Sequence, residues 1–320
     1  MSEAERFFDC KYAAHFTRAE LSMLDQKAAL YAVEPTYRET LYEIATRVDQ
    51  LSAMGPLLRQ TSIGLIRPDA IAHGKVADAL TFYGQLGIHP TYAMQIEVDR
   101  IAVREIWRYQ LTAASGARIR LLDLVLTAGP SVLTCFAADP DIPELPCTVL
   151  MADAKGPADV AERQGWELRS RLHSPNRIEV YIHCADEPAD VVRDGGLLLG
   201  AAGFADAIAG SQRQWPAGPE RVMEMASRAA TDPRMREEVV IDPVFHGVVE
   251  GRLGASRVDR WQLIRTAAAG CSMLTGSAES QISDSGIAQW WKSSGLLDQR
   301  EHYFRERTGW TAGPLADPLP

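Results

Sequence analysis

The chain has 320 residues, 46% of them hydrophobic and 23% charged, a balance typical of a globular protein that buries a sizeable core. Its formal net charge of −9 argues against non-specific binding to nucleic acid or to an anionic membrane, because both need a basic surface. The five cysteines are widely spaced without a CxxC pair, so neither a disulfide framework nor a metal site is expected.

The start of the chain is acidic and lacks the basic and apolar regions of a signal peptide. No apolar run in the sequence is long enough to span a bilayer as a helix. We therefore expect a cytoplasmic protein that does not cross a membrane.

Residues 1–60 carry apolar side chains at helical spacing, and Thr36 is a candidate N-cap for the second of two helical stretches. We predict an N-terminal helical extension over this range. Residues 204–320 return to helical patterns beginning near Pro219, Val258 and Gly286, and end in a Pro/Gly-rich tail. They form the predicted C-terminal helical region.

Between these two regions, residues 61–203 alternate short apolar runs with helical patterns. The predicted elements are strands at 62–66, 87–97, 131–136 and 177–183, helices at 74–83, 99–110 and 117–128, a loop at 155–172, and a helix that begins at the N-cap Asp186. This alternation without a GxGxxG motif favours an α+β fold over a Rossmann domain. Because no Walker A sequence occurs either, any phosphate must be held by side chains.

His183 ends the last of these strands and precedes the helix that begins near Asp186 and Pro188. A lone histidine at a strand end is often only a hydrogen-bonded structural residue. Asp194, however, lies eleven residues further along the chain, about three helical turns, and could fold back toward the imidazole. A carboxylate bonded to one ring nitrogen fixes the tautomer and leaves the other nitrogen free as a nucleophile.

Four segments together resemble the nucleoside diphosphate kinase family in their order along the chain. They are Leu65-Ile-Arg-Pro-Asp69 with the later Gly74, Ala128-Gly-Pro130 before a strand, Gly156-Pro-Ala-Asp159 before an arginine-containing loop, and His183-Cys-Ala-Asp186 with the helix after it. The resemblance implies a ferredoxin-like antiparallel sheet with helices on one side. It also implies transfer of a γ-phosphate through a phosphohistidine, Mg²⁺ bound with the nucleotide, and assembly into a homo-oligomer.

By this resemblance His183 is the nucleophile, Asp194 orients it, and Arg67 stands where the family has a phosphate-contacting lysine. Trp107 takes the place of a tyrosine near the γ-phosphate. Further candidates for phosphate or nucleotide binding are Arg118 or Arg120, Arg169 or Arg171, and Lys155. Residues two apart on a helix do not share a face, so at most one of Arg118 and Arg120 is expected to contact a ligand.

Structural alternatives exist for these cations. Arg67 could instead form a salt bridge with Asp69, and Arg169 and Arg171 could belong to a solvated run of charge. The sequence departs from the family pattern at Ala70, Val149, Val180 and Ala185.

Two functions therefore remain open. The first is a diverged phosphotransferase-like enzyme acting on a nucleotide or phosphorylated small molecule, with His183 as nucleophile or as general acid/base. The second is a catalytically silent nucleotide-binding or scaffold protein whose helical extensions contact partners.

Overall fold

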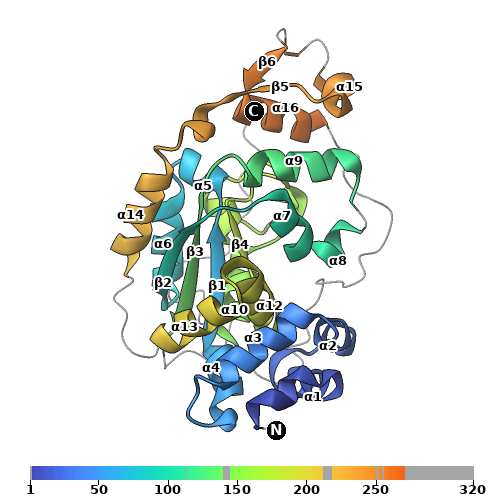
Figure 1. Cartoon of the computed structure of the whole chain (residues 1–320). Coiled ribbons are helices and arrows are strands. Elements are labelled where there is room, and N and C mark those ends of the chain that lie inside the picture. Colours follow the sequence, from blue (N-terminus) through green and yellow to red (C-terminus); the bar gives the residue numbers. More distant parts are fainter. Residues whose placement is uncertain are drawn as a thin grey trace.

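A computed structural model describes residues 2–112, 114–139, 145–211, 218–249, 252–253 and 256–270 of the chain. Its centre is a four-stranded antiparallel sheet in the order β2-β3-β1-β4 (Figure 1). The strands are β1 (Thr61–Ile66), β2 (Ile88–Ile96), β3 (Ser131–Ala138) and β4 (Ile182–Cys184). The predicted mixture of helices with an antiparallel-capable sheet is confirmed at this level.

Helices account for the first sixty residues, as predicted. They are η1 (Ala4–Phe8), α1 (Cys10–Phe16), η2 (Thr17–Leu21), α2 (Asp25–Ala32), α3 (Pro35–Ala45), η3 (Leu51–Ala53) and α4 (Met54–Gln60). The predicted N-cap Thr36 is wrong, because α3 begins one residue earlier at Pro35 and Glu34 is its N-cap. Proline fits the first helical position, where the missing N–H costs no hydrogen bond.

The middle of the chain places helices between and after the strands. They are α5 (Pro68–Ala72), α6 (Val76–Gln85), α7 (Arg100–Ile106), α8 (Arg108–Leu111), α9 (Gly116–Leu126), α10 (Cys147–Lys155), η4 (Val160–Glu162), α11 (Leu168–Arg171), α12 (Pro188–Leu199) and α13 (Ala201–Ser211). The helix predicted at 99–110 is divided at Trp107, which ends α7. The N-terminal part of the predicted 155–172 loop contains η4, and its end contains α11.

The strand predicted at 177–183 is much shorter, since only Ile182–Cys184 pairs with β1. Tyr181 has a φ of +66°, in the left-handed region, so the extended backbone cannot run through it. The helix after β4 also differs from the prediction. Glu187, rather than Asp186, is its N-cap, and it forms a capping box with Asp190.

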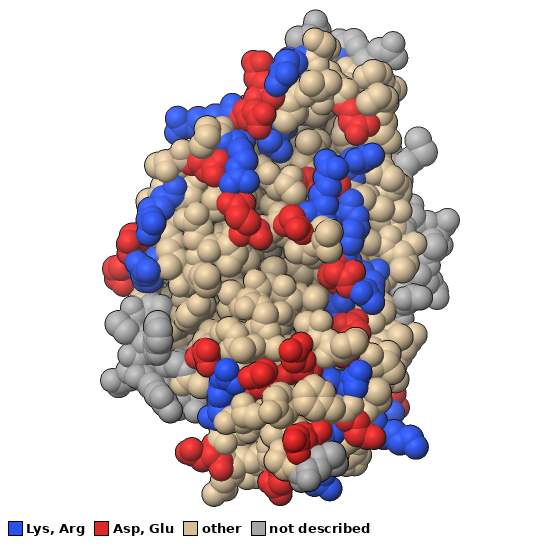
Figure 2. Space-filling model, viewed as in Figure 1, with Lys and Arg blue, Asp and Glu red and all other residues tan. Residues whose placement is uncertain are grey.

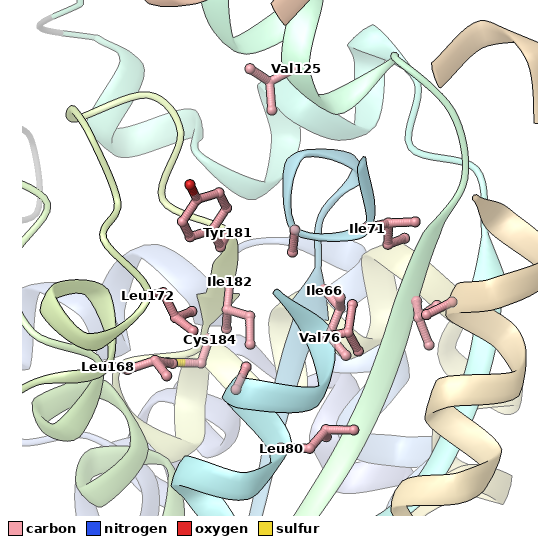
Figure 3. Close-up of a cluster of buried hydrophobic side chains, with 14 of the residues drawn as sticks. Ile66, Ile71, Val76, Leu80, Val125, Leu168, Leu172, Tyr181, Ile182 and Cys184 are labelled. Atoms are coloured by element: carbon pink, nitrogen blue, oxygen red, sulfur yellow. The ribbon is translucent and has the colours of Figure 1, made fainter. Parts of the chain in front are cut away.

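Both faces of the sheet are covered, whereas the family resemblance implied helices on one side. All six residues of β1 are buried, and the two-residue period of the strand places its large apolar side chains in two different hydrophobic cores. Ile63 and Leu65 belong to the core that includes α12, α13 and the N-terminal helices. Ile66, Ile182 and Cys184 belong to the opposite core with α6 and α14 (Pro219–Ala229), part of which Figure 3 shows.

The described C-terminal residues begin with α14 and include a small sheet that the sequence did not predict. The elements are η5 (Pro233–Arg236), β5 (Glu238–Val240), η6 (Pro243–Phe245), α15 (His246–Val249), β6 (Arg257–Asp259) and α16 (Arg260–Gly270). The start of the helix predicted from Val258 is therefore wrong, since Val258 pairs with Val239 in the β5–β6 sheet. The helix predicted from Gly286 and the tail lie outside the described residues.

The boundary predicted at residue 203 falls inside α13, a helix that packs against α3 of the N-terminal extension.

Among the described residues, no helix combines the length and apolarity that a membrane span requires.

Candidate functional site

His183 lies on β4 opposite Leu65 of β1, so its side chain faces the core that contains α12. Its Nε2 atom is 3.1 Å from Oδ2 of Asp194, which projects from the second turn of α12. The distance is that of a hydrogen bond, and it confirms the predicted approach of the carboxylate to the imidazole.

One nitrogen of the His183 ring is left free by this contact. An ionised Asp194 accepts a hydrogen bond from Nε2, which places the ring proton on that nitrogen and leaves the lone pair on Nδ1. Among the described residues no group bonds to Nδ1, and the side chain is 17% exposed. The edge of the Trp107 indole packs on the imidazole, with ring centroids 4.9 Å apart and planes at 67°. The contacts with Asp194 and Trp107 therefore hold the ring in place, and part of its surface is exposed.

Asp194 is itself almost fully buried, at 4% exposed. Burial raises the pKa of this carboxyl, against the opposing effects of the hydrogen bond to His183 and of the nearby Arg193 guanidinium. One Arg193 nitrogen, Nη1, is 3.7 Å from Asp194 Oδ1. The two oxygens of Asp194 thus lie between an imidazole and a cation.

Arg193 is the largest of the fully buried side chains, at 1% exposed. Its Nε donates to Glu34 Oε2 at 2.8 Å, and Nη2 and Nη1 donate to the carbonyl oxygens of Glu105 and Ile106 at 2.8 and 3.3 Å. Those carbonyls end α7, immediately before Trp107. The same guanidinium therefore contacts Asp194 and holds the chain that carries Trp107, the two neighbours of His183.

Glu34 also accepts a hydrogen bond of 2.6 Å from the Tyr109 hydroxyl through its second oxygen. The Arg193 guanidinium lies over the rings of Tyr31 and Tyr109, 5.1 and 5.4 Å from their centroids. Sequence inspection missed Glu34 and Arg193 entirely. They lie far apart in the chain, and neither belongs to a recognisable motif.

A second buried ion-pair cluster joins the N-terminal helices to the start of α12. Lys27 Nζ lies 2.8 Å from Asp190 and 3.2 Å from Glu187, and the Tyr31 hydroxyl donates to Asp190 at 2.6 Å. Ser22 donates to Glu187 at 2.7 Å. The extension is thus bonded to α12 at its N-cap, its first turn and, through Arg193, its middle.

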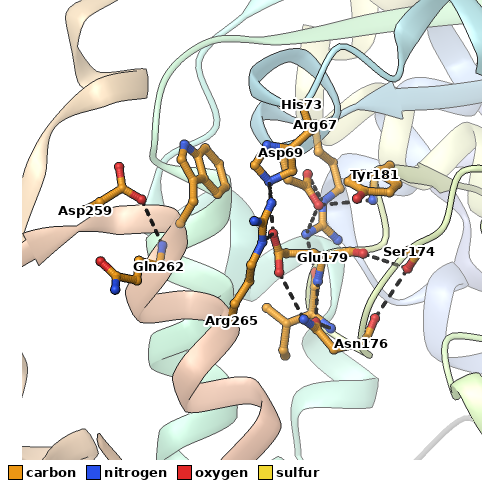
Figure 4. Close-up of polar contacts among 12 residues, drawn as sticks. Arg67, Asp69, His73, Ser174, Asn176, Glu179, Tyr181, Asp259, Gln262 and Arg265 are labelled. Carbon is orange, nitrogen blue, oxygen red and sulfur yellow. Dashed lines mark hydrogen bonds and ion pairs between the residues drawn. The ribbon is translucent and has the colours of Figure 1, made fainter. Parts of the chain in front are cut away.

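The predicted phosphate ligands do not converge on His183. Arg67 is 2% exposed and pairs with Asp69 at 3.1 Å, while its Nη2 donates to the Ile178 carbonyl at 2.6 Å, as the structural alternative proposed (Figure 4). Arg169 donates to the Gly156 carbonyl at 2.5 Å. Burial lowers the pKa of Arg169 to about 10.

The remaining candidates are placed differently. Arg171 is directed to the Trp166 carbonyl and the Phe82 ring. Lys155 approaches Asp186 at 3.4 Å, and although burial lowers the pKa of its amine, the Asp186 charge outweighs that effect and raises it. Asp186 in turn interacts electrostatically with His183. Lys155 is thus a predicted cation that is linked to His183 indirectly, because Asp186 interacts with both residues.

Arg118 and Arg120 diverge on α9, as their spacing predicted. Arg120 is exposed and approaches Asp242 at 3.7 Å. Arg118 is half-buried, and its guanidinium forms no hydrogen bond or ion pair with the described residues. Burial lowers the pKa of Arg118, and the charge of Arg177 lowers it further.

The described residues contain no group of three or more histidine, cysteine or acidic side chains able to hold a metal ion. On the face shown in Figure 2, basic and acidic side chains alternate around a central area with neither. No known protein-family model matches the chain, and no curated protein is significantly similar to it in sequence.

Proposed function

We propose that the chain is a diverged phosphotransferase-like enzyme with a nucleoside diphosphate kinase-like domain, acting on a nucleotide or another phosphorylated small molecule. The observation that carries the proposal is the contact of 3.1 Å between His183 Nε2 and Asp194 Oδ2, with Nδ1 left unbonded among the described residues. Such a pair supplies a nucleophilic nitrogen and a carboxylate that stabilises the positive charge formed on the ring.

The strand order supports the fold assignment. Ferredoxin-like sheets place the strands of two interleaved βαβ units in the antiparallel order β2-β3-β1-β4, which is the order of the four strands here. His183 lies on the fourth strand, beside the first. The motif resemblance around Arg67-Pro68-Asp69 and His183 agrees with this arrangement.

In the proposed reaction the Nδ1 lone pair of His183 attacks the phosphorus of the donor. The bond from phosphorus to the leaving oxygen breaks, and that oxygen keeps the electron pair. Asp194 holds the Nε2 proton and balances the charge of the phosphorylated imidazolium. An acceptor oxygen then attacks the phosphorus, and the bond from phosphorus to Nδ1 breaks. Its electron pair returns to Nδ1, which restores the neutral ring, and the proton of the acceptor passes to water.

Recognition of phosphate is assigned first to Arg118 and then to Lys155. Arg118 has no bonded partner among the described residues, and burial and the charge of Arg177 lower its pKa, whereas Arg177 itself pairs with Asp159 at 2.9 Å. A bound anion would supply Arg118 with the partner it lacks. Lys155 is a further candidate because of its link through Asp186. Mg²⁺, if the substrate is a nucleotide, would be held by the phosphate oxygens and would neutralise part of their charge.

General acid/base catalysis by His183 is the second candidate. Two predicted phosphate ligands, Arg67 and Arg169, are bonded to protein groups, and the carboxylates Asp186 and Asp194 both interact with His183. The carboxylates around His183 suit proton transfer between the imidazole and a substrate. They favour a ligand with fewer phosphates than a nucleoside triphosphate.

The test is incubation of the full chain with γ-labelled ATP and Mg²⁺. The nucleophile mechanism predicts an acid-labile, base-stable label that is absent from His183→Ala and retained by His89→Ala, an exposed histidine on β2. Nucleotide binding without a label would reject the phosphohistidine. A phosphate-ligand screen for turnover dependent on His183 would then decide between acid/base catalysis and a silent binding protein.

A further inference from the structure

The N-terminal helices contribute a side chain to the group of residues around His183. Glu34, the N-cap residue of α3, reaches Arg193 on α12 at 2.8 Å, and its side chain is 10% exposed. The pair lies deep in the molecule, where charges are weakly screened and an unmatched one is costly. A contact of this kind is a strong constraint on both helices.

We infer that Glu34 and Arg193 are positioning residues for the His183–Asp194 pair, and that the N-terminal extension is a working part of the site. The inference rests on the proposed use of His183. It gives the extension a role in the site, whereas the alternative of a silent scaffold protein gave it contacts with partners.

The geometry gives Arg193 two ways to act on His183. Its Nη1 atom lies 3.7 Å from Asp194 Oδ1, while Asp194 Oδ2 contacts His183. Arg193 and His183 therefore share the two oxygens of one carboxylate. Through Nη1 and Nη2 Arg193 also holds the last carbonyls of α7, which fix Trp107 against the imidazole edge. A planar guanidinium can make these contacts at once, whereas a lysine ammonium cannot.

The charge of Glu34 determines which carboxylate is the main partner of Arg193. With Glu34 ionised, Arg193 has a full hydrogen-bonded partner at 2.8 Å, and Asp194 remains the longer contact at 3.7 Å. Removal of the Glu34 charge leaves Asp194 as the nearest carboxylate to the guanidinium. We expect Asp194 then to turn toward Arg193 and to loosen its hydrogen bond to His183.

The other charged groups near His183 come from separate elements. Asp186 lies between β4 and α12 and interacts electrostatically with the imidazole, and it is held by Lys155 of α10 at 3.4 Å. Lys27 of α2 also interacts with Asp186. Substitution of Glu34 leaves all three of these residues in place.

The experiment is tautomer determination for His183 by NMR of the full chain labelled with ¹⁵N-histidine, with the His183 signals assigned by their loss in His183→Gln. The wild type is expected to show one neutral tautomer with the proton on Nε2. In Glu34→Gln and in Arg193→Lys this single tautomer is expected to be lost, and the two ring nitrogen signals move toward each other as the forms exchange.

Two controls separate positioning from general weakening. Glu43→Gln removes a partly exposed charge from the same helix as Glu34, where it pairs with Arg47. Ser22→Ala removes the hydrogen bond to Glu187, another contact between the extension and α12. Both controls should keep the Nε2–H tautomer even if they lower the melting temperature.

A folded Glu34→Gln protein with an unchanged tautomer overturns the inference. If that variant does not fold, Arg193→Lys decides the question, because it keeps the buried positive charge and removes the planar guanidinium that contacts Glu34, Asp194 and the end of α7. An unchanged tautomer in Arg193→Lys overturns the inference as well. A wild type that takes no phosphoryl label, with the tautomer still dependent on Glu34, rejects the proposed phosphoryl transfer and leaves the positioning role intact.

Discussion

Glu179 illustrates how one buried carboxylate joins separate parts of the chain. It is completely buried and is contacted by His73 at 3.0 Å, Asn176 at 3.0 Å and Arg265 of α16 at 3.2 Å (Figure 4). Burial alone would raise the pKa of Glu179. The contact with His73, the hydrogen bond from Asn176 and the charge of Arg265 outweigh burial and hold the pKa of Glu179 below its ordinary value.

This lowered pKa predicts a stability contribution with a defined sign. The contribution of Glu179 is fully present above its ordinary value of 4.5 and is lost as the pH falls through the lower folded-state pKa. We expect Glu179→Gln to cost about 1–3 kcal/mol of unfolding free energy at pH 7, from the lost charged hydrogen bonds. The difference from wild type should shrink as the pH falls below 4.5.

Urea unfolding at a series of pH values measures this difference. Glu238→Gln is the control, because Glu238 is an exposed residue of β5 in the same C-terminal region. A gap between Glu179→Gln and wild type that stays constant down to acidic pH would contradict the assignment of the lowered pKa.

The individual site residues show where sequence inference succeeded. His183 and Asp194 are close in sequence and separated by a strand end and a helix start, so local periodicity was enough to bring them together. Arg67 forms the salt bridge that was its structural alternative, because Asp69 is only two residues away in the chain. Glu34 and Arg193 could not be paired in advance, since their contact depends on how two distant helices pack.

At the scale of elements, α12 is the helix on which the site depends, and it packs unusually close to its neighbours. A Cβ atom placed on Gly196 would lie 2.1 Å from Thr40 Oγ1 and 3.1 Å from Thr40 Cβ, on α3. Thr40 is fully buried, so it has no room to move aside. The glycine is therefore required by helix contact, although glycine is a poor helix former.

We predict that Gly196→Ala destabilises the protein by about 1–3 kcal/mol, because overpacking outweighs the gain in helix propensity. Gly84→Ala in α6 is the matched control. No atom lies within 4 Å of its added Cβ, so only the propensity gain of about 0.5–1 kcal/mol remains.

Chemical denaturation measures the free energy of unfolding of the two variants. Gly196→Ala should lower it and Gly84→Ala should raise it. Adding Thr40→Ala to Gly196→Ala should recover part of the loss, since it removes the nearer clashing atom. Equal effects of the two glycine substitutions would show that α3 and α12 are less tightly apposed than this contact implies.

Elements also show why the rest of the fold was not predictable. Helical periodicity located α2, α3, α6 and α9, because buried apolar residues recur along each of them. The shortening of β4 depends on one left-handed residue, Tyr181, that carries no sequence signal. The β5–β6 sheet pairs residues about twenty positions apart across a connection that local patterns do not define.

At the scale of the whole molecule, the N-terminal extension is part of the main core. Tyr37, Leu41 and Met54 share one hydrophobic cluster with Leu65 and Leu133 of the sheet, through α12 and α13 (Figure 1). The buried cation Lys27 is matched by carboxylates on α12 in the same interface. Sequence periodicity identified these helices but described them as an appendage.

Removal of residues 1–60 is therefore expected to abolish stable folding of the remaining chain. The truncation exposes apolar surface on α12 and α13, removes Glu34 from Arg193, and removes Lys27 from Glu187 and Asp190. Removing one partner of a buried ion pair costs about 3–5 kcal/mol. That sum rivals the total stability of about 5–15 kcal/mol for an ordinary domain. Circular dichroism and dye binding should report a poorly packed or aggregating product.

Because the interface is hydrophobic and charge-matched, residues 1–60 supplied as a separate polypeptide should restore a soluble complex. A truncated chain that unfolds cooperatively with wild-type stability would show that the extension is dispensable, and would remove the structural basis for its contact with the His183 site.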